Sequence, residues 1–427
     1  MELTKKQLYR KEQLNKALAG LCTNRELAME LNITIGHAKT IKRRYKESGD
    51  NSLVHGNTGH IPKHAISQKE TESIIKIWNS INSNGQRIFE NCNFSHFSDC
   101  LKDYYGINRC RNTISKILKD AGYVSPKKHK NKKKSPTHER RQPRERIGEL
   151  IQGDATPYEW FEDGHKYALH ALIDDATKLP VGMFMTKNEC SFGYYESFRY
   201  MLLNYGRPEA LYVDKLSVFF YNNKNQKKDI TEQLEEDDDS KTQFAQSCEK
   251  LGIELIPANS PQAKGRVERF WELVQSRLPV ELKIRNITTV EEANLFLPEF
   301  MKIIGKRFSV KPAKEESAFL KLTQKQTTDL AKILAVKVKR TTDSGCIFSL
   351  KNYLFKAPGI SKQKITVYLS IQDGIYAETT NGKRVELELF DEDSSGNRMP
   401  QVWKDLIEDY FLKDAKAKYR FVYKKTG

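Results

Sequence analysis

The stretch ELIQGDATPYEW, residues 149–160, decides the class of the fold because it predicts a buried β-strand that ends near one acidic residue, Asp154. The sequence KYALHALIDDATKLPVGMFMT, residues 166–186, predicts two further strands, and the DDATK segment between them predicts the turn. Three consecutive strands therefore open this part of the chain.

Helices and strands alternate after residue 186. The sequence predicts a helix in SFGYYESFRYMLLNYG (191–206), a strand in EALYVD (209–214), a helix in TQFAQSCEKLG (242–252) and a strand in IELIPA (253–258). A loop of Pro, Gly, Lys and Arg then enters an amphipathic helix within SPQAKGRVERFWELVQSRLP (260–279). This order predicts an α/β fold with a mixed sheet.

Three acidic residues fall at the edges of these elements: Asp154 in the first strand, Asp214 at the end of the fourth, and Glu268 in the first turn of a helix. Carboxylates gathered in one place repel each other unless a cation neutralises them, and Mg²⁺ or Mn²⁺ fits oxygen ligands best. Two such ions about 3.5–4 Å apart activate a water or a 3′-hydroxyl and stabilise the leaving oxygen of a phosphoryl displacement. An ordinary helix start remains the alternative for Glu268, because acidic residues are favoured near helix N-termini.

The segments IQGDATPYEWF, YALHALIDDATK, ALYVD and SPQAKGRVER occur in this order and resemble the integrase-core transposases of bacterial insertion sequences. The resemblance extends from the N-terminal helices to about residue 355, and IIGKRFSVKPAKEESAFLKL (303–322) is also similar to this family. It implies an RNase H-like catalytic core in which Asp154, Asp214 and Glu268 form a D-D-E triad that holds two Mg²⁺ (or Mn²⁺) ions.

The chain departs from the family pattern in one respect. Fifty-three residues separate Asp214 from Glu268, which is more than is typical of the integrase superfamily. NNKNQKKDITEQLEEDDDS, residues 222–240, accounts for the excess, because these nineteen residues are mostly polar and charged and have little to bury. We interpret it as a surface loop, with its acidic run as a weaker candidate for metal binding.

Other charged residues near the triad have competing interpretations. Asp174 and Asp175 are either metal ligands or, as we expect, caps of the hairpin turn. Glu272 lies one turn after Glu268 and is either a substitute for it or a surface partner of Arg or Lys. Three basic residues are predicted phosphate contacts: Lys264, Arg266 and Arg269.

The N-terminal sequence TNRELAMELNITIGHAKTIKRRYKESG, residues 23–49, predicts a helix-turn-helix unit. Thr23 and Glu26 form a capping box at the start of the first helix, and NIT at 32–34 makes the turn. The second helix is expected to pack through Ile35, Ala38 and Tyr45. The predicted contacts to phosphates and base edges are His37, Thr40, Lys42, Arg43 and Arg44. An ordinary basic helical hairpin is the alternative.

A second helical unit, expected to be another helix-turn-helix that binds DNA, is predicted from SQKETESIIKIWNSI, SHFSDCLKDYYGI and NRCRNTISKILKDAGY. In the last of these, Ile107, Ile114, Ile117 and Leu118 are expected to face inward. The predicted DNA contacts are Arg109, Arg111, Asn112 and Lys116. Four potential zinc ligands lie close together in this region (Cys92, His96, Cys100 and Cys110), but their spacing matches no standard finger, so residues lining a helix face are the favoured interpretation.

Composition restricts the class of partner. The formal net charge of +17 indicates a polyanionic partner. No segment approaches the roughly 18 apolar residues of a spanning helix, so we expect nucleic acid rather than a membrane. The N-terminus does not resemble a signal peptide, and seven scattered cysteines without a CxxC pair favour a reducing compartment, expected to be a bacterial cytoplasm with association to the nucleoid.

Residues 126–146 contain ten Lys or Arg and only two Glu, and three prolines interrupt them. This composition predicts an extended linker that follows the phosphates of DNA. Its predicted DNA contacts are Lys127, Lys128, Lys132, Lys133 and Lys134. Further on, alternating residues and the Asn381-Gly382 turn predict a small β-barrel or sandwich, followed by a basic helical tail.

The sequence thus predicts seven segments: helix-turn-helix unit 1–62, second helical unit 63–124, basic linker 125–146, RNase H-like core 147–305, helical connector 306–339, small β-barrel 340–392 and C-terminal basic helical tail 393–427. The resemblance implies a DNA transposase that binds terminal inverted repeats, frees 3′-OH ends by hydrolysis and joins them to target DNA by transesterification. Joining two ends implies at least a homodimer on double-stranded DNA. The alternatives are a DNA-binding regulator with a non-catalytic core and a divalent-metal nuclease without strand transfer.

Overall fold

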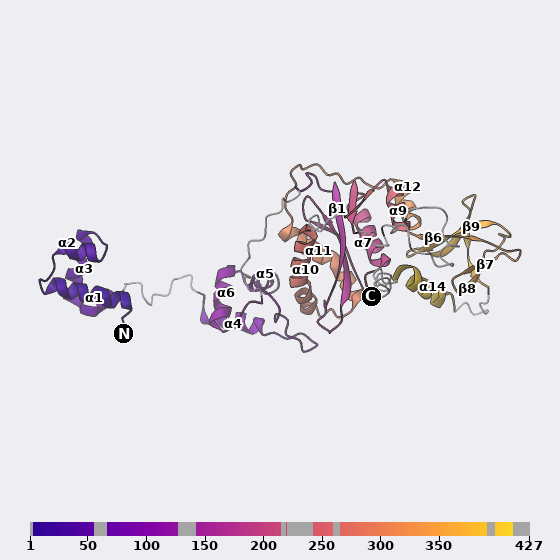
Figure 1. Cartoon of the computed structure of the whole chain (residues 1–427). Helices are drawn as coiled ribbons and strands as arrows, with labels where there is room; N and C mark the ends of the chain where they lie inside the picture. Colours follow the sequence, from indigo (N-terminus) through magenta and orange to yellow (C-terminus); the bar gives the residue numbers. More distant parts are fainter. Residues whose placement is uncertain are drawn as a thin grey trace, which may run out of the picture. The chain divides into compact units, whose positions relative to one another are not determined.

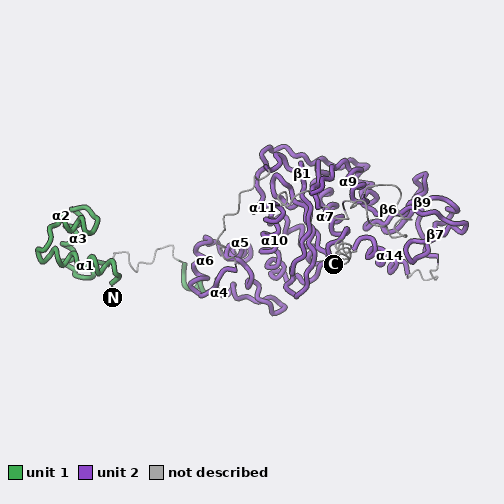
Figure 2. The backbone as a smooth tube through the Cα atoms, in the orientation of Figure 1, with its two compact units in different colours: residues 1–73 green, residues 74–427 purple. Residues whose placement is uncertain are grey.

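The chain is divided into two compact units, residues 1–73 and 74–427 (Figure 2). The computed structural model describes residues 3–54, 66–126, 142–214, 219, 242–258, 265–390 and 398–412. The acidic insert 222–240 and several predicted DNA contacts lie outside the described residues, namely Lys127, Lys128, Lys132, Lys133, Lys134 and Lys264. Within the described part of the chain, no helix has the length and apolarity that a membrane span requires.

The first unit is a three-helix bundle with helices α1 (Lys5–Leu18), α2 (Asn24–Glu30) and α3 (Ile35–Ser48), closed by a short 3-10 turn. The capping box predicted at Thr23 and Glu26 is confirmed at the start of α2. The expected packing of α3 is partly wrong: Ala38 and Tyr45 are buried, but Ile35 is 46% exposed and Ile41 fills the core instead. Ile35 is the first helical residue of α3 and is not part of the apolar cluster of this bundle.

The second unit begins with a helical segment made of α4 (Gln68–Trp78), α5 (Phe94–Tyr105) and α6 (Arg111–Asp120), and the boundary between the units falls within α4. Its core is aromatic: the Trp78 ring packs edge-on against Phe94 and Phe97. Ile114, Ile117 and Leu118 of α6 are buried as expected, whereas Ile107 is only half-buried.

A five-stranded mixed sheet forms the centre of the second unit, in the order β3-β2-β1-β4-β5. Strands β1, β2 and β3 are antiparallel, and β4 and β5 run parallel to β1, as the predicted mixed sheet requires. The strands are β1 (Leu150–Tyr158), β2 (Tyr167–Asp174), β3 (Pro180–Thr186), β4 (Ala210–Val213) and β5 (Glu254–Pro257). β1 continues four residues beyond Asp154, so the strand end expected at that residue is wrong.

Helices cover both faces of this sheet (Figure 1). Alternate side chains of β2 point to opposite faces, so Leu172 packs with α7 (Ser191–Asn204) and α9 (Gln243–Leu251), while Ala171 and Ile173 pack with α10 (Gly265–Ile284) and α11 (Val290–Phe308). The result is a three-layer α/β/α arrangement in which β1 lies in the middle of the sheet.

The C-terminal part consists of two small antiparallel sheets; of the two arrangements expected from the sequence, a barrel or a sandwich, the closed barrel is not found among the described residues. Two separate sheets, ordered β11-β10-β9-β6 and β12-β8-β7, pack through one shared apolar cluster, and β12 is too short to close a ring. The strands are β6 (Val336–Thr341), β7 (Ile347–Leu350), β8 (Tyr353–Lys356), β9 (Lys364–Ser370), β10 (Gly374–Thr379), β11 (Arg384–Glu386) and β12 (Glu388–Leu389).

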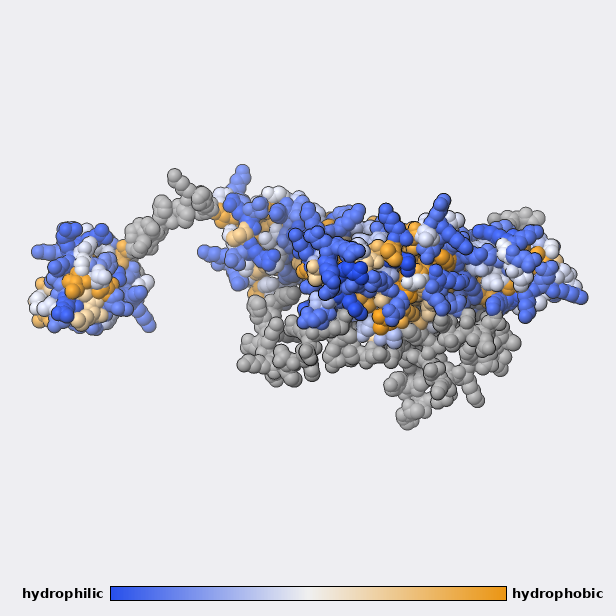
Figure 3. All heavy atoms as spheres, turned by 90° about the horizontal axis from the view of Figure 1, so that it is seen from above, coloured by the Kyte–Doolittle hydropathy of each residue, from blue (hydrophilic) through white to orange (hydrophobic). Residues whose placement is uncertain are grey.

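Short helices flank these sheets. The segment 306–339, expected to be a helical connector, is helical only at its start, in α12 (Gln324–Thr328) and in α13 (Leu330–Ile333). After the sheets, α14 (Met399–Ile407) continues into a π-helical turn, Glu408–Leu412. Hydrophilic side chains dominate the face of the molecule seen in Figure 3, and apolar side chains form patches between them.

Candidate active site

Asp154 and Asp214 stand at corresponding positions on neighbouring parallel strands. The β1–β4 register pairs Gln152 with Tyr212, and each aspartate follows its partner of that pair by two residues. Adjacent strands lie about 4.8 Å apart, so the register brings these two carboxylates to the same edge of the sheet. Both are half-buried, Asp154 within β1 and Asp214 immediately after β4.

The tyrosine Tyr194 provides independent support for this proximity. Tyr194 is 2% exposed, and its hydroxyl donates a hydrogen bond to Glu189 Oε1 at 2.8 Å. Burial raises the pKa of the Tyr194 hydroxyl well above its usual range, and the negative charges of Glu189, Asp154 and Asp214 raise it further. One buried phenol therefore interacts with both aspartates, which places a third carboxylate, that of Glu189, close to the same edge.

Helix α10 carries Glu268 past this edge. Glu268 is exposed in the first turn, and Trp271 follows it by three residues, which places the two side chains on the same side of the helix. The Trp271 indole Nε1–H donates a hydrogen bond to Asp154 Oδ2 at 2.9 Å. α10 is thus attached to β1 at the residue predicted to be the first metal ligand.

The three predicted ligands do not form a tight cluster. Among the described residues, only His96, Cys100 and Glu281 bring His, Cys, Asp or Glu ligand atoms within 4.8 Å of one another as a group of three. Two ions about 3.5–4 Å apart are held by carboxylates that span a wider distance than a one-ion cluster does. The donors of Asp154, Asp214 and Glu268 are all carboxylate oxygens, which suits Mg²⁺ or Mn²⁺.

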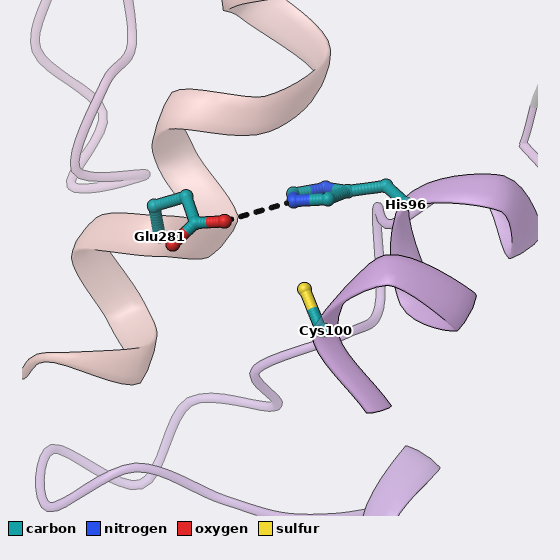
Figure 4. A group of neighbouring side chains, drawn as sticks. All are labelled: His96, Cys100 and Glu281. Carbon is teal, nitrogen blue, oxygen red and sulfur yellow. Dashed lines mark hydrogen bonds and ion pairs between the residues drawn. The ribbon is translucent and has the colours of Figure 1, made fainter. Parts of the chain in front are cut away.

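The His96, Cys100 and Glu281 side chains form a buried network between α5 and α10 (Figure 4). Both oxygens of Glu281 already accept hydrogen bonds, Oε1 from His96 Nε2 at 3.1 Å and Oε2 from Tyr104 and Arg285. Burial raises the pKa of the Cys100 thiol, which disfavours the thiolate that a metal requires. The exposed Cys110 lies outside this group, so the four-residue zinc interpretation has no support here.

The two aspartates of the hairpin have separate structural roles. Asp174 caps the turn, because its carboxylate accepts hydrogen bonds from the Thr177 backbone and hydroxyl, both at 2.7 Å. Asp175 is buried and pairs with the Arg266 guanidinium at 3.2 Å, while Gln152 donates to it at 2.6 Å. Of the predicted phosphate contacts near the triad, Arg266 is therefore engaged within the protein, and Arg269 is exposed on α10.

The predicted DNA contacts of the helical regions differ in their exposure. On α3, His37, Arg43 and Arg44 are exposed, whereas Thr40 and Lys42 are half-buried and the Lys42 ammonium donates to the Ala17 carbonyl at 2.6 Å. Lys42 thus helps to join α3 to α1. All four predicted contacts of the second helical unit, the sequence segment 63–124, are exposed on or next to α6, namely Arg109, Arg111, Asn112 and Lys116.

Sequence reasoning did not identify Glu189, Tyr194 or Trp271 as neighbours of the predicted triad. Trp271 occupies an apolar position of an amphipathic helix, which by itself predicts only a core residue. Its position three residues after Glu268 is the one sequence signal that could have pointed to it. Glu189 and Tyr194 carry no such signal, because only the packing of α7 on the sheet brings them close to Asp154 and Asp214.

No protein-family model matches the chain. In comparisons of structures, the chain is similar to the magnesium complex of the HTLV-2 integrase catalytic core, with 19% identity, a TM-score of 0.26, and coverage of 35% of this chain and 83% of that one. It is also similar to a chain of the simian T-cell lymphotropic virus intasome in complex with a PP2A regulatory subunit, with 13% identity, a TM-score of 0.28, and coverage of 71% and 97%.

Two transposases are more similar to this chain in sequence than these solved structures are. The chain is 29% identical over 315 residues to a putative transposase of Sinorhizobium fredii, covering 74% of this chain and 65% of the relative. It is 33% identical over 406 residues to the transposase of insertion sequence IS1202 of Streptococcus pneumoniae, covering 84% of this chain and 83% of that protein. At this identity and coverage, the chain belongs to the family of insertion-sequence transposases.

Proposed function

We propose that the protein is a metal-dependent DNA transposase with Asp154, Asp214 and Glu268 as its catalytic carboxylates. The main support is the β1–β4 register, which aligns Asp154 with Asp214 although 59 residues intervene between them along the chain. Glu268 completes the triad from α10, whose next turn is hydrogen-bonded to Asp154. The reaction is hydrolysis of a phosphodiester to free a 3′-OH, followed by attack of that hydroxyl on target DNA.

Asp154, Asp214 and Glu268 would hold the Mg²⁺ or Mn²⁺ ions, two per site. When bound, such ions activate the attacking oxygen and stabilise the leaving oxygen of an in-line displacement. The chain itself supplies rigid supports for these ligands: Asp154 sits inside a strand paired on both sides, and Asp214 follows a strand that is paired on both sides. The exposed Arg269 is well placed on α10 to contact a phosphate beside the ions.

DNA recognition is assigned to the helical regions. In the first unit, the exposed His37, Arg43 and Arg44 of α3 would contact phosphates and base edges of the terminal inverted repeat. The exposed residues around α6 would extend this contact along the DNA, and the net charge of +17 favours such binding at low salt. Because two transposon ends must be joined to one target, the active species is expected to be at least a homodimer on DNA.

A strand-transfer assay tests the proposal. Asp154→Asn, Asp214→Asn and Glu268→Gln should each abolish both cleavage and joining in Mg²⁺ and in Mn²⁺. Glu272→Gln is the matched control, because Glu272 is an exposed carboxylate one turn further along the same helix. Its activity should match that of the wild type.

The rival functions give different results in the same assay. Near-wild-type activity of any triad variant would refute the assignment of that residue. Cleavage without any joined product would identify a nuclease, and binding to transposon ends without cleavage by the wild-type chain would identify a regulator.

A further inference from the structure

Trp271 is a buried tryptophan whose only polar atom points at a predicted metal ligand. Its side chain is 7% exposed, and the indole Nε1–H donates to Asp154 Oδ2 at 2.9 Å. The ring packs edge-on against Phe270 at 5.4 Å and belongs to the apolar cluster between the sheet and α10 and α11. Packing therefore fixes the direction in which the N–H points.

A second contact shows that α10 and β1 lie side by side over more than this one hydrogen bond. One turn after Trp271, Gln275 Nε2 approaches Thr156 Oγ1 at 3.5 Å. Four helical residues rise about 6.0 Å, and two strand residues rise about 6.6 Å. α10 and β1 therefore advance by nearly the same distance between the two contacts. As a result, Glu268, on the turn before Trp271, keeps a fixed position relative to the strand that contains Asp154.

We propose that Trp271 is a positioning residue for the metal site: its N–H fixes the rotation of the Asp154 carboxylate and ties the helix that carries Glu268 to that ligand. The inference rests on the proposed function, because it assumes that Asp154 binds the metal. An indole N–H only donates, and each carboxylate oxygen has two lone pairs. Oδ2 can thus accept the indole hydrogen and still offer a lone pair to a cation.

Trp160 provides a matched control within the same apolar cluster. It is also buried and also donates its indole N–H, but to the backbone carbonyl of Tyr167 at 2.8 Å and not to a carboxylate. Trp160→Phe and Trp271→Phe therefore remove the same chemical group from the same core. Only the second removes a hydrogen bond to a predicted ligand.

The test measures Mn²⁺ binding directly, by electron paramagnetic resonance of free Mn²⁺, on the full chain without DNA. Trp271→Phe should weaken Mn²⁺ binding about tenfold, the usual effect of removing a partner that orients a metal ligand. The Mn²⁺ concentration for half-maximal cleavage should rise by a similar factor, and activity should recover at saturating Mn²⁺. Trp160→Phe should leave both values unchanged, although it lowers thermal stability.

Three outcomes would overturn the inference. Unchanged Mn²⁺ binding in Trp271→Phe would show that the hydrogen bond does not orient the ligand. An equal loss in Trp160→Phe would show a general loosening of the core. Asp154→Asn separates the two proposals: if it retains wild-type Mn²⁺ binding and activity, the proposed function is wrong at this residue, and the role of Trp271 falls with it.

Should Trp271→Phe fail to fold, the wild-type chain answers the same question. It has four tryptophans, and hence four indole N–H signals in a nitrogen-15 correlation spectrum. The signal displaced most by Asp154→Asn should also be the one displaced by Mg²⁺. If Mg²⁺ leaves that signal in place, the inference is overturned.

Discussion

His96 Nε2 lies 3.1 Å from Glu281 Oε1, and this pair joins α5 to the core helix α10 with both side chains almost completely buried. The contact is part of a charged interface. Arg277 and Lys283 of α10 are also buried: Arg277 pairs with Asp99 of α5 at 2.7 Å, and the Lys283 ammonium donates to the Arg87 carbonyl at 3.3 Å. The helical segment thus contacts the core through charged side chains. Removal of one member of a pair leaves the charge of the other member buried without a partner.

Glu281→Gln should strongly destabilise the second unit. The change leaves Arg285 without its buried counter-charge and turns one acceptor into a donor that faces His96 or Tyr104. Breaking a buried pair in this way costs about 3–5 kcal/mol. Thermal unfolding followed by circular dichroism measures the effect.

Glu299→Gln is the control, because Glu299 pairs with the same arginine at 2.9 Å but is 62% exposed. An exposed pair contributes only about 0–1 kcal/mol. Equal losses in the two variants would contradict the assignment of Glu281 as the centre of the interface.

Acid should destabilise this interface in two steps. Burial lowers the pKa of His96 below its ordinary value of 6.5, so below that pH the unfolded chain takes up a proton that the folded chain excludes. Burial alone would raise the pKa of Glu281, but hydrogen bonds from His96 and Tyr104 and the nearby charges lower it from 4.5 to about 2. The contribution of this pair to the free energy of unfolding is therefore fully present above pH 6.5. It decreases below pH 6.5 as His96 of the unfolded chain takes up a proton, and it decreases again between pH 4.5 and 2 because of Glu281.

His96→Gln isolates the first step. The glutamine keeps a donor for Glu281 but does not titrate, so its melting temperature should change less between pH 7 and pH 5 than that of the wild type. Differential scanning calorimetry across this range measures the slope. Identical slopes in the two proteins would show that His96 does not titrate as expected.

Arg44→Gln should weaken binding of a short DNA duplex and lower the slope of log K against log salt by about 1, because one phosphate contact is lost. Lys16→Gln is the matched control: it removes the same charge from an exposed position of α1 in the same unit. Fluorescence anisotropy at several salt concentrations measures both slopes. If the two variants lose the same amount of DNA affinity, DNA binding depends on the net charge of the protein and not on α3.

Gly193→Ala and Gly36→Ala should change stability in opposite directions. A Cβ at Gly193 of α7 would lie 2.2 Å from the His170 ring, and such overpacking costs about 1–3 kcal/mol. A Cβ at Gly36 of α3 would meet nothing within 4 Å, so alanine should add up to about 1 kcal/mol through its helix propensity. Calorimetry of both variants checks the signs; a stable Gly193→Ala protein would contradict the close packing of α7 on β2.

Much of the fold is local enough to be predicted from the sequence. The capping box of Thr23 and Glu26 and the alternation of 166–186 each define an element from neighbouring residues. The predictions failed where an element's length or packing depends on distant partners. β1 extends to Tyr158 because β2 pairs with it along its whole length, and the C-terminal strands form two sheets because their pairing partners are not set by local pattern.

The sequence by itself determined the order of helices and strands, the basic surface, and the three acidic residues proposed as ligands, because residue type and periodicity encode them directly. The tertiary structure decided which residues surround those ligands. Strand register aligned Asp154 with Asp214, helix packing directed the Trp271 N–H at Asp154, and the contact of α5 with α10 buried His96 against Glu281. These relationships join residues 60 to 185 positions apart along the chain, and only packing and pairing between whole elements fix such distances.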